Sequence, residues 1–310
     1  MTLHSRRTLV GITGLALAGL MALSACGSAD PLAEEPTNSD TGGADAPLVV
    51  GSQDYYSNEI IAELYAQALE AGGYEVDRQL RIGQREVYMP EIEAGKIDVF
   101  PEYTGNLLQY YDPETTATAS DDVYAALGTA LPDGLSVLEQ SPATDQDSYV
   151  VTSDFAKQHS LTSIGDLAGV PDLVLGGNSE LETRPYGPKG LDSVYGVQVS
   201  FTPVEDSGGP LTVKAVRDGQ VQLVDLYSAD PVFADGDLVT LEDPEGLFLA
   251  SHVVPVVSGR VDDGAVKIMN AVSAALTPDA LVALNAQSVN DESPAATIAK
   301  AWLAEQQLIG

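Results

Sequence analysis

The chain has 310 residues, with 14 Lys and Arg against 46 Asp and Glu, so its formal net charge at pH 7 is −32. This charge argues against a nucleic-acid partner and favours a cationic ligand, although solubility explains it equally well. The single cysteine excludes an intrachain disulfide and a Cys-x-x-Cys redox or zinc site. We expect no cofactor and no metal.

The first 26 residues have the pattern of an export signal. Arg6 and Arg7 precede an apolar stretch over residues 9–23, which is short for a membrane span. Residues 23–26 (Leu-Ser-Ala-Cys) resemble a bacterial lipobox, which implies cleavage before Cys26 and a lipid on its sulfur. The arginine pair faintly resembles a twin-arginine signal, so the export route stays open.

Residues 27–46 are small, polar and acidic, and they could bury little apolar surface. Such a composition predicts a flexible tether. Together with the lipid on Cys26, it predicts an extracytoplasmic protein that is anchored to the cell membrane and does not span it.

From residue 47 onward, predicted strands alternate with predicted helices. The strands are expected at 48–52, 76–82, 97–100, 135–138, 149–151, 173–175, 197–201, 221–226 and 253–257. The helices are expected from residue 57 to the glycines at 72 and 73, and at 86–93, 121–131, 154–159, 189–195, 211–216, 263–276, 278–287 and 294–307. This alternation predicts an α/β fold in which mostly parallel sheets are covered by helices.

Two lobes are expected, because the chain would cross between two sheets near residues 145–149 and 250–253. Residues 47–146 and 253–310 would form lobe I, and residues 147–252 would form lobe II. A hinge of two segments lets lobes rotate as rigid bodies around a central site.

Two stretches 124 residues apart, at residues 94–104 and 218–228, share one sequence pattern. Each copy turns at a glycine, runs through a short strand and ends in a tyrosine followed by Thr or Ser. Ligands of open α/β sheets bind outside the carboxyl ends of strands. Tyr103 and Tyr227 could therefore close on one ligand from opposite lobes, although either alone could be an ordinary residue at the edge of a core.

Tyr149, at the start of a crossing strand, is a third candidate. Aromatic faces attract quaternary ammonium groups, and three desolvated faces would contribute roughly 6 kcal/mol. Micromolar affinity needs about 8 kcal/mol, so a second element is required. Arg184 follows a glycine-rich turn and has a planar fork suited to a carboxylate. Alternatively, it forms a surface ion pair with Glu180 or Glu182.

Five motifs occur together in the order seen in one family: residues 49–52, 102–105 (Glu-Tyr-Thr-Gly), 147–149, 180–185 and 227–230. Over residues 47–310 the chain resembles the ProX-like, OpuC-type substrate-binding proteins of osmoprotectant ABC importers. The resemblance implies a two-lobed fold of the periplasmic-binding-protein type II class with a ligand cleft between the lobes. It also implies glycine betaine, choline, carnitine or a similar solute as the ligand, and ABC permease subunits as partners.

The resemblance assigns residues to the site as well. Tyr103, Tyr149 and Tyr227 would be cage walls, and Arg184 would bind the ligand carboxylate with Glu180 bracing it. Two further ligand-binding residues are implied in the first lobe: Asn106 as a donor to the carboxylate, and Gln53 where some members have a carboxylate-binding lysine. Thr104, within the Glu-Tyr-Thr-Gly motif, would have a supporting role.

Family members that have a fourth cage tyrosine carry it in the segment that corresponds to residues 246–255. This chain departs from them, because it has no tyrosine there. Phe248 could replace that wall, His252 could line the site, or that side could be open. The ligand could therefore be another small cationic or zwitterionic solute.

Other function classes fit less well. A secreted hydrolase would have only His159 and His252 after removal of the signal, and no Gly-x-Ser-x-Gly elbow is present. A metal carrier would have only two histidines and no free cysteine. An adhesion module would leave the repeated tyrosine loops unexplained. We therefore expect a binding protein without enzymatic activity.

Overall fold

The computed structural model describes residues 46–310. The predicted signal peptide, Cys26 and nearly all of the predicted tether lie outside the described residues. The strands are β1 (Leu48–Gly51), β2 (Val76–Gln79), β3 (Val99–Tyr103), β4 (Leu135–Val137), β5 (Asp147–Thr152), β6 (Val174–Gly177), β7 (Ser200–Pro203), β8 (Leu223–Tyr227), β9 (Leu238–Thr240) and β10 (Val253–Ser258). The α-helices are α1 (Tyr56–Ala71), α2 (Arg85–Glu93), α3 (Thr104–Tyr111), α4 (Ser120–Ala130), α5 (Ser153–His159), α6 (Pro188–Gly190), α7 (Pro210–Arg217), α8 (Asp263–Ala275), α9 (Pro278–Val289) and α10 (Ala295–Glu305).

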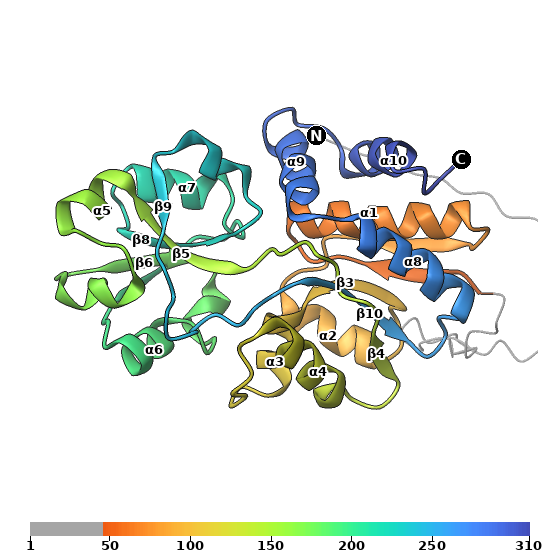
Figure 1. The fold of residues 1–310 in the computed structure, drawn as a ribbon, viewed down its shortest axis with the longest axis horizontal. Helices are drawn as coiled ribbons and strands as arrows, with labels where there is room; N and C mark the ends of the chain where they lie inside the picture. Colours follow the sequence, from red (N-terminus) through yellow and green to blue (C-terminus); the bar gives the residue numbers. More distant parts are fainter. Residues whose placement is uncertain (1–45) are drawn as a thin grey trace, which may run out of the picture. The chain divides into compact units, whose positions relative to one another are not determined.

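The strands form two sheets built on the same plan (Figure 1). The first has the order β2-β1-β3-β10-β4 and the second has the order β7-β6-β8-β5-β9. In each sheet two neighbouring pairs are parallel and two are antiparallel. The sheets are thus mixed, because β10 and β5 each run opposite to the central strand beside them.

Each sheet with its helices forms one lobe, and the chain passes between them twice. It leaves the first sheet after β4 and enters the second at β5; it returns between β9 and β10. The two connecting segments meet at an antiparallel bridge between Thr144 and His252. A ligand bound between the lobes would therefore lie close to both connections.

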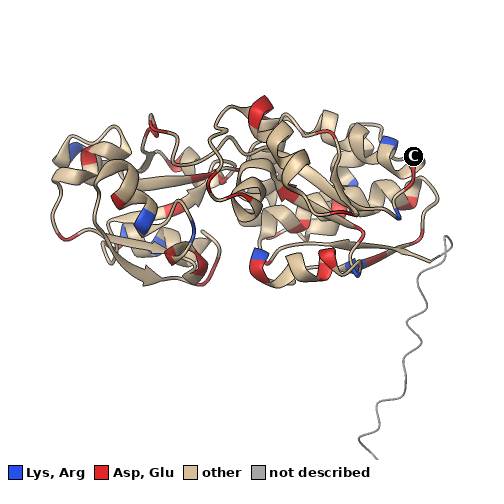
Figure 2. Ribbon diagram, turned by 90° about the horizontal axis from the view of Figure 1, so that it is seen from below, with Lys and Arg blue, Asp and Glu red and all other residues tan. Residues whose placement is uncertain are grey.

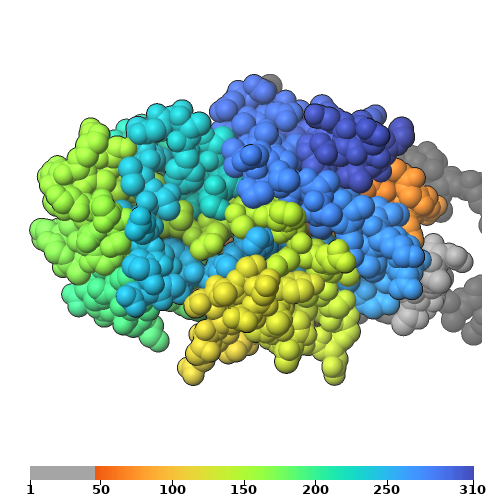
Figure 3. Space-filling model, in the orientation of Figure 1, coloured from red at the N-terminus to blue at the C-terminus, as the bar shows by residue number. Residues whose placement is uncertain are grey.

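The first lobe is held by a large apolar core. Helix α1 buries Ile60, Ile61 and Leu64 completely, and it packs against α8, α9 and α10. In Figure 3 the C-terminal helices, in blue, lie directly against the orange surface of the α1 region. Every residue of β10 is buried, which explains its continuous β-branched run.

The repeated sequence forms equivalent structure in both lobes. Gly95 and Gly219 both have a φ of 70°, a left-handed conformation that glycine adopts without strain. The strands that follow, β3 and β8, occupy the centre of their sheets. Tyr103 and Tyr227 are the last residues of these strands, as the repeat predicts.

Some elements differ from the sequence-based expectation. Helix α3 and the short strand β9 were not expected, and both lie beside the lobe connections. The expected helix at 189–195 is a short α6 followed by a π-helical turn, Leu191–Tyr195. The strand expected at 197–201 lies at β7, Ser200–Pro203, because Gly196 ends the preceding turn in a left-handed conformation.

Acidic residues are spread over both lobes and do not gather on one of them (Figure 2). Within residues 46–310, no three His, Cys, Asp or Glu side chains form a group able to hold a metal ion. No single helix in that range is both long and apolar enough to cross a membrane; α8 and α9 pass that test only together, with a bend of 88° between them.

Candidate functional site

The face of the second sheet at the ends of β5 and β8 carries two acids and two tyrosines. In the antiparallel register, Asp147 lies opposite Tyr227 and Tyr149 lies opposite Asp225. Alternate residues of a strand share a face, so all four side chains project to the same side of the sheet.

Three of these residues line a small cavity of about 20 Å³. Its wall includes Asp147, Asp225, Tyr227, Arg184 and Tyr186 from the second lobe, and Gln84 from the first. That volume admits about one water molecule, whereas small-molecule sites usually measure about 300–1,000 Å³. A ligand can therefore enter only if the walls move apart.

A larger cavity of about 420 Å³ lies next to it, and both lobes line it. Tyr55 and Gln84 of the first lobe face Asn178 and Ser207 of the second. Gln84 Nε2 donates to Ser207 Oγ at 2.9 Å, and Ser207 Oγ donates to the Asp54 carbonyl at 3.2 Å. These bonds join the lobes at the mouth of the cleft.

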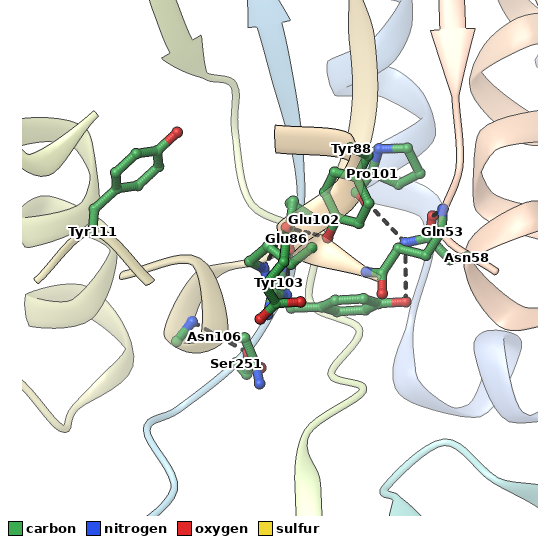
Figure 4. A network of polar contacts seen from close by, with 12 residues as sticks. Gln53, Asn58, Glu86, Tyr88, Pro101, Glu102, Tyr103, Asn106, Tyr111 and Ser251 are labelled. Atoms are coloured by element: carbon green, nitrogen blue, oxygen red, sulfur yellow. Dashed lines mark hydrogen bonds and ion pairs between the residues drawn. The ribbon is translucent and has the colours of Figure 1, made fainter. Parts of the chain in front are cut away.

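Tyr103 is buried at the end of β3 in the apolar core of the first lobe and lines neither cavity, and a polar network fixes its ring (Figure 4). Its hydroxyl accepts a hydrogen bond from Asn58 Nδ2 at 3.3 Å, and Asn58 Oδ1 accepts one from the backbone N–H of Gln53 at 2.9 Å. Burial raises the pKa of Tyr103 well above its usual range. The Gln53 Nε2 atom is buried and has no partner in the described chain, so this amide is free to bind a ligand.

A buried ion pair holds the backbone of Tyr103. Arg85 binds the Glu102 carboxylate through two hydrogen bonds of 2.7 and 2.9 Å, and Tyr88 donates to the same carboxylate at 2.5 Å. Glu102 in turn accepts the Tyr103 backbone N–H at 2.8 Å. The Glu-Tyr pair of the Glu-Tyr-Thr-Gly motif thus joins a buried carboxylate to the tyrosine that ends β3.

Asn106 joins the two lobes. Its Nδ2 donates to Asp147 and, at 3.1 Å, to the hydroxyl of Tyr186, while its Oδ1 accepts from Ser251 at 2.8 Å. Figure 4 shows the contact between Asn106 and Ser251. The amide that was expected to contact a ligand carboxylate is therefore bound to a carboxylate of the protein in this closed arrangement.

Arg184 projects toward the same region. Its Nη1 donates to the Tyr186 hydroxyl at 2.9 Å, and its Nη2 lies 3.4 Å from Glu86 of the first lobe. Its ion pair among the described residues is therefore with Glu86, and not with Glu180 or Glu182. Glu180 lines the small cavity, and its buried Oε2 has no partner in residues 46–310.

Tyr149 and Phe248 pack together inside the second lobe, with ring centroids 5.0 Å apart. Tyr149 is fully buried, and its hydroxyl donates to the Tyr186 carbonyl. Phe248 also contacts the Tyr186 ring, at 5.4 Å. Neither Tyr149 nor Phe248 lines the small cavity in this arrangement. Both contact Tyr186, which does line it.

His252 and Thr104 lie at the lobe connections. His252 Nδ1 is 2.8 Å from the Ser141 carbonyl, and its backbone N–H donates to Thr104 Oγ1 at 3.0 Å. Thr104 also donates to the Ala250 carbonyl at 3.3 Å. Both residues therefore join α3 to the segment that leads into β10, away from the cavity wall.

Four residues at the cleft were missed by the sequence reasoning: Tyr55, Tyr186, Asp147 and Asp225. The Tyr55 ring packs against that of Tyr227 at 4.6 Å, and its hydroxyl donates to Asp145 at 3.2 Å. A usable signal was present, because the two missed acids stand two residues before Tyr149 and Tyr227. The period of two along a strand places each acid on the face of its tyrosine.

Comparison with known proteins gives a consistent result. The family model described as the substrate-binding domain of ABC-type glycine betaine transport systems (OpuAC) matches residues 46–305. The glycine betaine-binding protein YehZ of Escherichia coli (strain K12) is 25% identical over 231 residues, which cover 70% of this chain and 76% of YehZ.

Solved structures share the fold. A glycine betaine/carnitine/choline ABC transporter protein superposes with a TM-score of 0.67 at 18% identity, covering 84% of this chain and 99% of that one. Lactococcal OpuAC, in its closed conformation with glycine betaine, has a TM-score of 0.62 at 15% identity, covering 85% of this chain and 97% of that one. These likenesses confirm the expected two-lobed fold, and the match over residues 46–305 shows that the chain belongs to the substrate-binding domain family of ABC-type glycine betaine transport systems.

Proposed function

We propose that this protein captures a small quaternary-ammonium solute, such as glycine betaine, choline or carnitine, and delivers it to the permease of an ABC importer. The observation that carries the proposal is the pair of tyrosines, Tyr103 and Tyr227, at the ends of equivalent central strands in two lobes. The names of the relatives include all three solutes. The family is one of transport binding proteins and not an enzyme class, and we propose that this chain likewise catalyses no reaction.

The aromatic groups of the cleft suit a methylated cation. Tyr55 and Tyr103 come from the first lobe, and Tyr186 and Tyr227 from the second. When the lobes separate and close again around a ligand, these rings would replace the water around its ammonium group. Arg184 and the Gln53 amide are the donors available for a carboxylate, as in glycine betaine.

The location of the protein is also part of the proposal. Residues 1–26 would direct export, and a lipid on Cys26 would hold the mature chain at the outer face of the cell membrane. Replacing Cys26 by Ser should move the protein from the membrane fraction to the soluble fraction without changing ligand binding.

A thermal-shift screen of the purified protein with glycine betaine, choline, carnitine and proline tests the proposal. A ligand at 100 times its Kd stabilises the folded state by about 2.7 kcal/mol. At least one quaternary-ammonium compound should raise Tm at millimolar concentration, and proline, which lacks the methylated nitrogen, should do so less. If none of the methylated compounds shifts Tm, the proposal is wrong.

A further inference from the structure

Two carboxyl groups lie together in the wall of the small cavity. Asp147 is 6% exposed and Asp225 is 8% exposed, and both line the cavity beside Tyr227. Asp147 accepts a hydrogen bond from Asn106. Asp225 Oδ1, by contrast, is buried and accepts no hydrogen bond from any donor in the described chain.

Charges around the pair do not neutralise it. Arg184 is the cation facing it in the cavity wall, and Arg184 also contacts Glu86 at 3.4 Å. The other titratable groups facing the pair are acids and phenols: Glu180 in the wall, and the tyrosines at 149, 186 and 227. First-lobe residues contribute only neutral amides here, from Gln84 and Asn106. Arg85, farther away, is paired with Glu102.

Ionising both members of a buried pair of carboxyl groups costs free energy, because their like charges repel and neither is well solvated. Burial, and next the neighbouring Asp147, raise the pKa of Asp225 well above its usual range. One proton between the two groups would replace the repulsion by a hydrogen bond and would supply the donor that Asp225 Oδ1 lacks.

We infer that the Asp147–Asp225 pair holds one proton in the free protein and releases it to solvent when a cationic ligand binds beside it. The ammonium charge then takes over the role of the proton, so the net charge of the site is the same before and after. The inference rests on the proposed function, since the cation is the quaternary ammonium group. It adds Asp147 and Asp225 to the residues that select for a cation.

Such coupling makes affinity depend on pH. Wherever the free pair is protonated, each cation bound releases up to one proton, so affinity rises by up to about tenfold per pH unit. A site of neutral aromatic rings alone would bind choline equally well across this range, because tyrosine and the quaternary ammonium group do not titrate there.

Isothermal titration of choline into the purified protein tests the inference, at pH 5, 6, 7 and 8 and in two buffers of different ionisation enthalpy. Choline is the probe because it carries the cation without a carboxylate. We expect tighter binding with rising pH and a heat that differs between buffers in proportion to the protons released. Asp225→Asn should abolish both effects, and Asp147→Asn should do the same if the pair shares the proton.

Asp54→Asn is the matched control. Asp54 lies at the mouth of the same cleft, is half-exposed and pairs with Arg81, so its loss removes the same charge without touching the pair. This variant should keep the pH dependence of the parent protein. Choline binding that is independent of pH and buffer in the parent, or unchanged pH dependence in both pair variants, would overturn the inference and leave the proposed function standing. Failure of choline and glycine betaine to bind at any pH would overturn both.

Discussion

Tyr227 shows how one residue connects the sequence repeat to the cleft. It ends β8, lines the small cavity and packs against Tyr55 of the other lobe. In the closed arrangement the two rings contact each other, so each ring shields from water the apolar face that a bound methylated ligand would cover. Ligand binding would exchange this ring–ring contact for ring–cation contacts.

Replacing Tyr227 by Ala should weaken choline binding well over tenfold, because a desolvated aromatic face contributes about 2 kcal/mol to a bound cation. Tyr227→Phe keeps the ring and is the matched control, and it should lose only a small part of the affinity. Titration calorimetry of both variants measures the difference. A loss of less than twofold for Tyr227→Ala would refute its role as a cage wall.

Asp145 gives a pH dependence of stability. It is 3% exposed, accepts hydrogen bonds from Tyr55 and the Ala229 N–H, and has its pKa raised to about 7 by burial. Between about pH 4 and pH 7 the folded state therefore binds a proton that the unfolded state has lost, and the free energy of unfolding decreases as pH rises. From pH 5 to pH 8 the decrease should reach up to about 3 kcal/mol.

Denaturant unfolding of the parent protein and of Asp145→Asn, each at pH 5 and pH 8, measures this effect. Other titrating groups, including Asp225, are the same in both proteins, so the difference between their pH dependences isolates Asp145. The parent should lose more stability than the variant between the two pH values. Equal losses would show that Asp145 titrates normally in the fold.

At the scale of elements, the turns before β3 and β8 have the same conformation, with a glycine at the equivalent position in each. A Cβ atom at Gly95 or Gly219 would meet no atom within 4 Å, so the cost of an alanine there is conformational. Gly95→Ala and Gly219→Ala should each lower the free energy of unfolding by about 1–2 kcal/mol, because both residues have a φ of 70°.

Gly128→Ala is the matched control, since Gly128 lies in α4 and a Cβ there also meets nothing within 4 Å. Alanine should stabilise this helix by about 0.5–1 kcal/mol. Urea unfolding of the three variants compares the sites. Stabilisation by Gly95→Ala or Gly219→Ala would contradict the conformation assigned to these turns.

Most elements were predictable because their signals are local. The expected helix from residue 57 to the glycine pair is α1, and the β-branched run at 253–257 is β10. Helix α3 was missed because it begins directly after β3 without a capping side chain, and its place depends on hydrogen bonds to residues 251 and 252. Strand β9 has three residues and exists only through its pairing with β5.

The site was predictable in part. The repeat and the family motifs led to Tyr227 and Arg184, which line the small cavity, and to Tyr103, whose contact with a ligand stays a prediction. Contacts across the cleft are not encoded in local sequence. The pairing of Asn106 with Asp147 and the packing of Tyr55 on Tyr227 depend on how the lobes close. Whether Tyr149 and Phe248 meet a ligand depends on the same closure.

At the scale of the whole molecule, the described chain is in a closed state that would have to open for a ligand. The lobes are joined by two connecting segments and by side-chain contacts such as Gln84 with Ser207 and Tyr56 with Asp230. A cavity of about 20 Å³ between aromatic and acidic side chains leaves no room for a trimethylammonium group. Binding in this small cavity therefore requires opening and reclosing about the connections, as in hinge-type receptors.

A crystal structure of the protein with glycine betaine or choline tests the central claim most directly. We expect the methylated nitrogen within about 6 Å of the ring centroids of both Tyr103 and Tyr227, the distance at which cation–π attraction acts. A ligand bound elsewhere, or tyrosine rings that stay packed in separate lobes with the ligand in place, would contradict the account.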